Sequence, residues 1–122
     1  EIKSFFSDVS SCLNRAHLII SRSGASSLAE FCIFGRPSIL IPLPSSVGNH
    51  QALSASVMEE GGASVVLNQQ DLTFHLLSQK ISYLLKNFRV ANKMAVSAKR
   101  LYQPDAASNF VEELEKLVQR DN

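Results

Sequence analysis

The sequence predicts an α/β fold in which a Rossmann-like parallel sheet is flanked by helices. Three short apolar runs are rich in Ile, Val and Leu without clean alternation, which is typical of buried parallel strands. Segments with helical spacing of apolar residues separate these runs. Strand and helix therefore alternate, and the crossover connections that this order implies place the strands parallel.

The three predicted strands are apolar runs that follow polar or turn-forming residues. They are residues 17–21 (HLIIS), 38–42 (SILIP) and 64–67 (SVVL). Because neither face of such a run is polar, both faces of the sheet should be covered by helices. We therefore expect a three-layer arrangement with at least three parallel strands.

Helices are expected between the strands, at residues 8–15, 26–34 and 50–60. The second of these places Leu28, Phe31 and Cys32 on one face. Gly35 and Gly61 each follow the last helical residue, where a left-handed conformation commonly ends a helix.

Three further helices are expected after the third strand. The first is capped by Asp71 or Thr73. Its apolar residues are Leu76, Leu77, Ile81, Leu84 and Leu85. The second covers about residues 90–101. The third follows Pro104 and Asp105, and its apolar residues are Val111, Leu114, Leu117 and Val118.

Composition excludes several classes of protein. The formal net charge is +1 and the basic residues are scattered, so we expect no nucleic-acid partner. Cys12 and Cys32 form no CxxC pair and the histidines are dispersed. We therefore expect no metal site, no cofactor and two buried free thiols in a reducing compartment. The chain begins with Glu1 and runs directly into an apolar-rich stretch, so we expect it to be a piece of a longer protein.

The stretch 21–30 (SRSGASSLAE) follows a predicted strand and opens a predicted helix. Gly24 permits a sharp turn and a close approach of the backbone to a ligand. Free N–H groups at the start of the helix, at the positive end of its dipole, suit a phosphate or diphosphate. Ser23, Ser26 and Ser27 add hydroxyl donors.

Glu30 lies about one turn into this helix, where its carboxylate is placed to accept hydrogen bonds from two vicinal sugar hydroxyls. An alternative is that residues 27–30 (SLAE) form a capping box, in which Glu30 bonds only to the backbone. The spacing alone leaves both interpretations open.

A second polar loop, residues 42–51 (PLPSSVGNHQ), follows the second predicted strand. Ligands of open α/β sheets gather at the carboxyl ends of the strands, so His50 and Gln51 are candidates to bind hydroxyls or phosphate oxygens. The alternative is that Asn49 caps the next helix and His50 is solvated.

Together these stretches resemble the MurG-type glycosyltransferases, which add N-acetylglucosamine to the lipid-linked muramyl-pentapeptide precursor of peptidoglycan. The matching stretches follow in order along the chain: 21–25 with Glu30, 35–42, 50–51 with Ala55, 60–63, 71–73 and 104–107. No single motif decides the resemblance, but their occurrence together in register is specific.

The resemblance implies a GT-B architecture, with two Rossmann-like domains and a cleft between them. Residues 1–122 would form part of the C-terminal, UDP-sugar-binding domain. The N-terminal domain, which supplies the acceptor site, the membrane-contacting surface and the candidate base, would be absent, as would the beginning of the donor domain.

The donor-binding residues that the resemblance implies are Phe6, Ser23, Gly24, Ala25, Ser26, Ser27, Glu30, His50 and Gln51. The backbone amide of Phe6 would bind the uracil, the loop at Gly24 would lie against the diphosphate, and Glu30 would hold the ribose. His50 and Gln51 would bind sugar hydroxyls. His50 and Ser54 depart from the family, where a second glutamine and an asparagine are common.

The implied function is that of a UDP-N-acetylglucosamine-dependent hexosyltransferase, cytoplasmic and peripheral on the inner face of the cell membrane. This chain would bind the donor, and a missing domain would contact the lipid-linked acceptor and the membrane. No catalytic residue is expected here, so the chain alone should be inactive. The alternatives are a non-catalytic nucleotide-sugar-binding subunit of a two-chain dolichol-linked-sugar transferase, and part of a UDP-N-acetylglucosamine epimerase.

Overall fold

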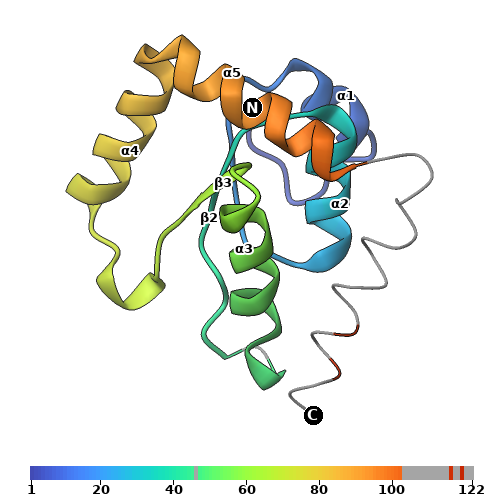
Figure 1. Cartoon of the computed structure of the whole chain (residues 1–122), viewed down its shortest axis with the longest axis vertical. Coiled ribbons are helices and arrows are strands. Elements are labelled where there is room, and N and C mark those ends of the chain that lie inside the picture. Colours follow the sequence, from blue (N-terminus) through green and yellow to red (C-terminus); the bar gives the residue numbers. More distant parts are fainter. Residues whose placement is uncertain (46, 103–115, 117–118, 120–122) are drawn as a thin grey trace.

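A computed structural model of the chain describes residues 1–45, 47–102, 116 and 119. Its centre is a parallel sheet of β1 (Ile19–Ser21), β2 (Ser38–Leu40) and β3 (Ser64–Val66), in the order β1-β2-β3 (Figure 1). Both strand pairs are parallel, with Ile39 of β2 opposite Ile20 on one side and Val65 on the other. The expected parallel sheet is confirmed, although each strand is shorter than its apolar run.

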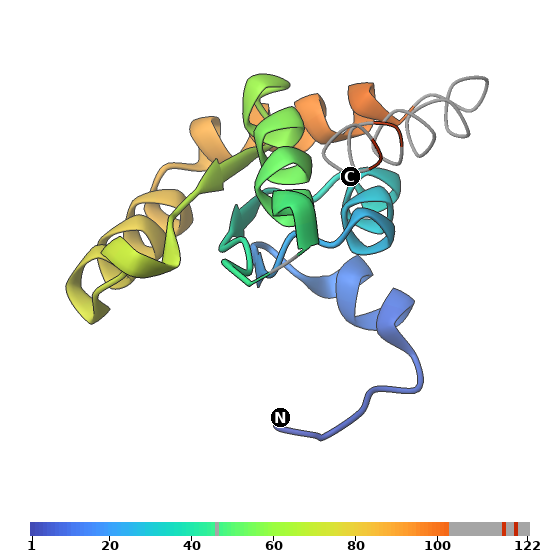
Figure 2. The same ribbon diagram turned by 90° about the horizontal axis from the view of Figure 1, so that it is seen from below.

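Helices cover both faces of this sheet. α2 (Ala25–Phe34) and α3 (His50–Glu60) lie on one side and α4 (Phe74–Lys86) lies on the other, which gives the expected three layers (Figure 2). α1 (Val9–Arg15) packs beside α2, and α5 (Phe88–Leu101) contacts both α2 and α4.

Two apolar clusters hold the layers together. The cluster on the α2–α3 side includes Leu28, Leu40 and Met58, all fully buried. The cluster on the α4 side is centred on Ile39 and Leu84. Because neighbouring residues of a strand point to opposite faces, the successive residues Ile39 and Leu40 serve one cluster each. Burial on both faces explains why β2 carries no polar alternation.

Two buried hydroxyls lie at the amino ends of β2 and β3. Ser38 and Ser64 are paired across β2 and β3, and their Oγ atoms are 2.6 Å apart. Each hydroxyl therefore satisfies the other, which removes the free-energy cost of burying it alone.

The helix boundaries largely follow the sequence. Thr73 caps α4 by accepting a hydrogen bond from the Leu76 N–H at 3.1 Å, whereas Asp71 ends a short 3-10 helix, η2 (Gln69–Asp71). α5 begins two residues before the expected start at residue 90. The apolar residues of the last expected helix, Val111, Leu114, Leu117 and Val118, lie outside the described residues.

One of the two expected glycine caps is wrong. Gly35 ends α2 with a φ of 59°, in the left-handed region as expected. Gly61 follows α3 with a φ of −74°, and the left-handed residue is Gly62, with a φ of 78°. The chain reverses into β3 one residue later than expected, because Gly61 continues the helical turn by donating its N–H to the Val57 carbonyl at 3.0 Å.

Both cysteines are free thiols, as expected. Cys32 is fully buried, with its Sγ 3.6 Å from the Met58 Sδ, and burial raises the pKa of its thiol to about 12. The expected burial is wrong for Cys12, which is only half-buried because α1 lies at the margin of the α2–α3 layer. Within the described part of the chain, no helix is long and apolar enough to span a membrane.

Candidate functional site

The candidate ligand-binding residues of the two polar loops gather at the carboxyl ends of the strands. The chain leaves β1 at Ser21 and β2 at Leu40, and the loops that follow lead into α2 and α3 (Figure 1). Both helices therefore begin at the same edge of the sheet. This is the edge where open parallel sheets bind ligands.

The N-terminus of α2 has no side-chain cap. Gly24 is the N-cap residue, and the first intrahelical hydrogen bond is donated by the Leu28 N–H to its carbonyl, at 3.1 Å. The N–H groups of Ala25, Ser26 and Ser27 consequently have no acceptor within the helix. No acidic residue occupies the first turn. This terminus therefore offers backbone donors and a positive dipole end to an anion.

Gly24 lies in extended backbone. Its φ of −66° and ψ of 139° suit any L-amino acid, so the turn does not require glycine. A Cβ atom built on Gly24 would meet no atom within 4 Å. The space beside this backbone is therefore open, and a ligand can approach it closely.

The capping-box interpretation of residues 27–30 is wrong. α2 begins at Ala25, so Ser27 is the third residue of the helix rather than its N-cap. Glu30 therefore lies beyond the first turn, where no unpaired backbone N–H is within reach of its carboxylate. Its side chain is exposed and has no hydrogen bond or ion pair with any described residue.

Ser23 and Gln51 join the two loops. Ser23 is fully buried, and its hydroxyl donates to the backbone carbonyl of Gln51 at 2.7 Å. The carboxamide oxygen of Gln51 accepts the Ser23 N–H at 3.3 Å and the Leu43 N–H at 2.9 Å. The hydroxyl of Ser23, which we expected to face a ligand, is thus used inside the protein.

Arg22 is a further link between the loops that the sequence did not reveal. Its guanidinium Nη1 donates to the carbonyl of Ile41 at 3.2 Å. The two residues are far apart in the chain and are brought together by the pairing of β1 with β2. No local sequence pattern marks an arginine for this partner.

His50 is the first residue of α3, and it is half-buried rather than solvated. Its Nε2 is buried without a hydrogen-bond partner among the described residues. Asn49 precedes it with a φ of 55° and gives no side-chain cap. Ser54, at a position where the resemblance left the local hydrogen bonding undefined, donates its hydroxyl to the His50 carbonyl at 2.9 Å.

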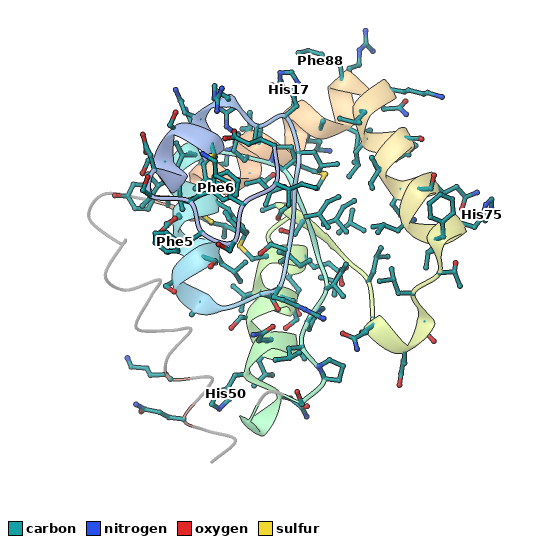
Figure 3. The ribbon with its side chains drawn as sticks, turned by 180° about the vertical axis from the view of Figure 1, so that it is seen from behind. Phe5, Phe6, His17, His50, His75 and Phe88 are labelled. Atoms are coloured by element: carbon teal, nitrogen blue, oxygen red, sulfur yellow. The ribbon has the colours of Figure 1, made fainter. Side chains whose placement is uncertain are left out.

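Phe6 lies apart from these residues. It belongs to the extended segment before α1, is half-buried and has the Lys3 Nζ 5.4 Å from its ring centre. Phe5 beside it is 80% exposed. Figure 3 shows both rings well separated from His50. The structure thus gathers the residues of the two loops and leaves Phe6 outside that group.

Two surface hollows flank the sheet. One, of about 340 Å³, lies at the carboxyl end of β1 and is lined by Arg22, Ile41 and Leu72 among others. The other, of about 300 Å³, lies at the opposite edge beside His17 and Phe88. Only the first adjoins the two loops described above.

The fold is that of a Rossmann-like domain, a class in which helix N-termini at the carboxyl edge of the sheet commonly bind phosphorylated ligands. The chain belongs to the family described as the glycosyltransferase family 28 C-terminal domain, which it matches over residues 1–116.

Several transferases are similar to this chain over nearly all of its length. The chain is 37% identical over 116 residues to the UDP-N-acetylglucosamine–N-acetylmuramyl-(pentapeptide) pyrophosphoryl-undecaprenol N-acetylglucosamine transferase of Caulobacter vibrioides, covering 95% of this chain and 32% of that protein. It is 38% identical over 116 residues to the transferase of the same name from Nostoc sp., with the same coverage. The crystal structure of MurG from Acinetobacter baumannii matches 95% of this chain and 33% of its own, with a TM-score of 0.79 at 30% identity. The chain therefore spans about a third of the length of these relatives.

Proposed function

We propose that this chain is the donor-binding portion of a glycosyltransferase that transfers N-acetylglucosamine from UDP-N-acetylglucosamine to a lipid-linked muramyl-pentapeptide. The observation that carries the proposal is the uncapped N-terminus of α2, at the carboxyl edge of the sheet and joined to the start of α3. Such a terminus suits the diphosphate of a nucleotide sugar. The names of the relatives support the choice of sugar and acceptor.

In this proposal the diphosphate lies against the free N–H groups of Ala25, Ser26 and Ser27. The open space beside Gly24 supports a close approach of the phosphate oxygens. Glu30 accepts the ribose hydroxyls, for which its exposed and unpaired carboxylate is suited. These three regions are all in the first two turns of α2 or directly before it.

At the sugar end, His50 and Gln51 are proposed to lie beside the hydroxyls of N-acetylglucosamine. The buried Nε2 of His50 supports this role, because a sugar hydroxyl would supply the partner that the described residues do not. At the other end, the backbone amide of Phe6 binds the uracil. Phe6 and His50 lie at separate places on the molecule, as contacts with opposite ends of a nucleotide sugar require.

In the proposed reaction, this chain holds the donor and stabilises the leaving group. A hydroxyl of the acceptor attacks the anomeric carbon, the bond to the diphosphate breaks, and UDP leaves with its added negative charge. The N–H groups at the start of α2 stabilise that charge. The general base, the acceptor site and the peripheral contact with the inner face of the membrane are proposed to lie in another domain, so this chain alone transfers no sugar.

Nuclear magnetic resonance of the isotopically labelled 122-residue chain tests the proposal. UDP-N-acetylglucosamine should shift the backbone amide resonances of Gly24, Ser26 and Ser27 in a saturable way, and it should also shift that of His50. UDP alone should shift the amides at the start of α2 with little effect at His50. Absence of shifts at the start of α2 with millimolar ligand would contradict donor binding at this edge.

A further inference from the structure

The side chain of Gln51 connects the two loops between which the donor is proposed to lie. Its carboxamide oxygen accepts hydrogen bonds from the Ser23 N–H at 3.3 Å and from the Leu43 N–H at 2.9 Å. Both partners are donors, so the atom that faces them must be the oxygen and not the nitrogen of the amide. Both hydrogen bonds end on the same oxygen atom, so Gln51 links the two loops through that single atom.

A further hydrogen bond, in the opposite direction, joins Ser23 to Gln51. The buried hydroxyl of Ser23 donates to the backbone carbonyl of Gln51 at 2.7 Å. Ser23 thus binds Gln51 through its backbone and through its side chain. Because Ser23 directly precedes Gly24, the N-cap of α2, these hydrogen bonds fix the start of α2 against the first turn of α3.

We propose that Gln51 is a positioning residue for the diphosphate site, in addition to its place beside the sugar. Its carboxamide oxygen holds the loop before Gly24 and the loop at Leu43 at the spacing that the ligand requires. The free N–H groups at the start of α2 point correctly only when that spacing is kept, because hydrogen bonds weaken steeply with distance and angle. This inference rests on the proposed donor binding and assigns the affinity for UDP itself partly to Gln51.

The comparison of two ligands separates positioning from direct contact with the sugar. Gln51→Met keeps the length of the side chain and removes the oxygen. If Gln51 positions the loops, this variant should lose affinity for UDP on the order of tenfold, although UDP carries no sugar. If Gln51 only binds sugar hydroxyls, the affinity for UDP-N-acetylglucosamine should fall and that for UDP should stay unchanged, which would overturn the proposal.

Ser23→Ala gives an independent measurement of the same connection. The Ser23 hydroxyl is buried and bonded to Gln51, so its loss should also weaken UDP binding if the connection matters. Gln79→Met is the matched control, because Gln79 is exposed on α4, on the other side of the sheet. It should leave the affinity for both ligands unchanged.

Amide hydrogen exchange of the ligand-free protein completes the test. The Leu43 N–H should exchange faster in Gln51→Met than in the wild type, and Gln51→Glu should restore its protection because a carboxylate also accepts two N–H donors. Unchanged exchange at Leu43 in Gln51→Met would overturn the positioning role even if wild-type UDP binding is intact. A wild-type chain that binds no UDP would instead overturn the proposed function, and with it the ligand part of this inference.

Discussion

Replacement of Glu30 tests the proposed ribose contact with little disturbance of the fold. The carboxylate is exposed on α2, has no partner among the described residues and takes no part in capping the helix. Two variants are informative. Glu30→Gln removes the charge and keeps one acceptor, whereas Glu30→Ala removes the whole group.

The expected magnitudes follow from these surroundings. A hydrogen bond to a charged group contributes about 1.5–3 kcal/mol, so loss of the contacts to the ribose should weaken UDP binding at least about tenfold. Glu30→Ala should weaken it at least as much as Glu30→Gln. The free energy of unfolding should change by only about 0.5 kcal/mol, because alanine is a good helix former and no capping hydrogen bond is lost.

Calorimetric titration with UDP, paired with melting curves of the ligand-free variants, measures both quantities. Glu60→Ala is the control, since Glu60 is also an exposed helical glutamate but ends α3, away from the carboxyl edge of the sheet. It should bind UDP like the wild type. Unchanged UDP affinity in both Glu30 variants would remove Glu30 from the site, and a large loss of stability would show that its role is structural.

Three further predictions concern the glycines, the buried thiol and catalysis. Gly24→Ala should change the free energy of unfolding by no more than about 1 kcal/mol, because the added Cβ has room in the protein. The same variant should weaken UDP binding, because the Cβ would occupy the space proposed for the diphosphate. Gly35→Ala, at a φ of 59°, should instead lower the melting temperature and leave the affinity for UDP unchanged. The pKa of the Cys32 thiol is about 12 in the folded protein and near 9 in the unfolded chain. The free energy of unfolding should therefore fall as the pH rises from 9 to 12, and at pH 10 the loss should be about 1.4 kcal/mol. Denaturation of Cys32→Ala across this pH range should not show this part of the decrease. The chain alone should transfer no N-acetylglucosamine from UDP-N-acetylglucosamine to a lipid-linked acceptor, and product formation without a partner in a radiolabel assay would contradict the proposed division of roles.

The layers of the fold could be predicted because local composition carries the information. The apolar run around Ile39 and Leu40 is buried on both faces, and this property alone distinguishes a central parallel strand. Helix caps with a side-chain hydrogen bond, such as Thr73, are equally local. The sequence could not predict that Gly62 rather than Gly61 is the left-handed residue, because either of two adjacent glycines can adopt a positive φ.

Only part of the candidate site could be predicted, because the order of residues along the chain does not fix where a helix begins. The stretch around Gly24 was identified correctly as a loop that opens a helix, since strand, glycine and helix follow one another in the chain. The capping-box interpretation of Ser27 failed because a three-residue spacing does not reveal where a helix begins. Here α2 starts three residues earlier than that interpretation requires, with Gly24 instead of Ser27 as its N-cap.

The roles of Ser23, Gln51 and Arg22 were beyond sequence reasoning because each depends on a partner at the end of another strand. The pairing of Ser21 with Leu40 in the sheet brings the two loops together, and only then do these polar groups meet. A serine and a glutamine next to a loop that is expected to bind phosphate are naturally interpreted as ligand contacts. In this fold the hydroxyl of Ser23 donates to the backbone of Gln51, and the carboxamide oxygen of Gln51 accepts the backbone N–H of Ser23, so the two residues fix the geometry of the backbone that we propose binds the diphosphate.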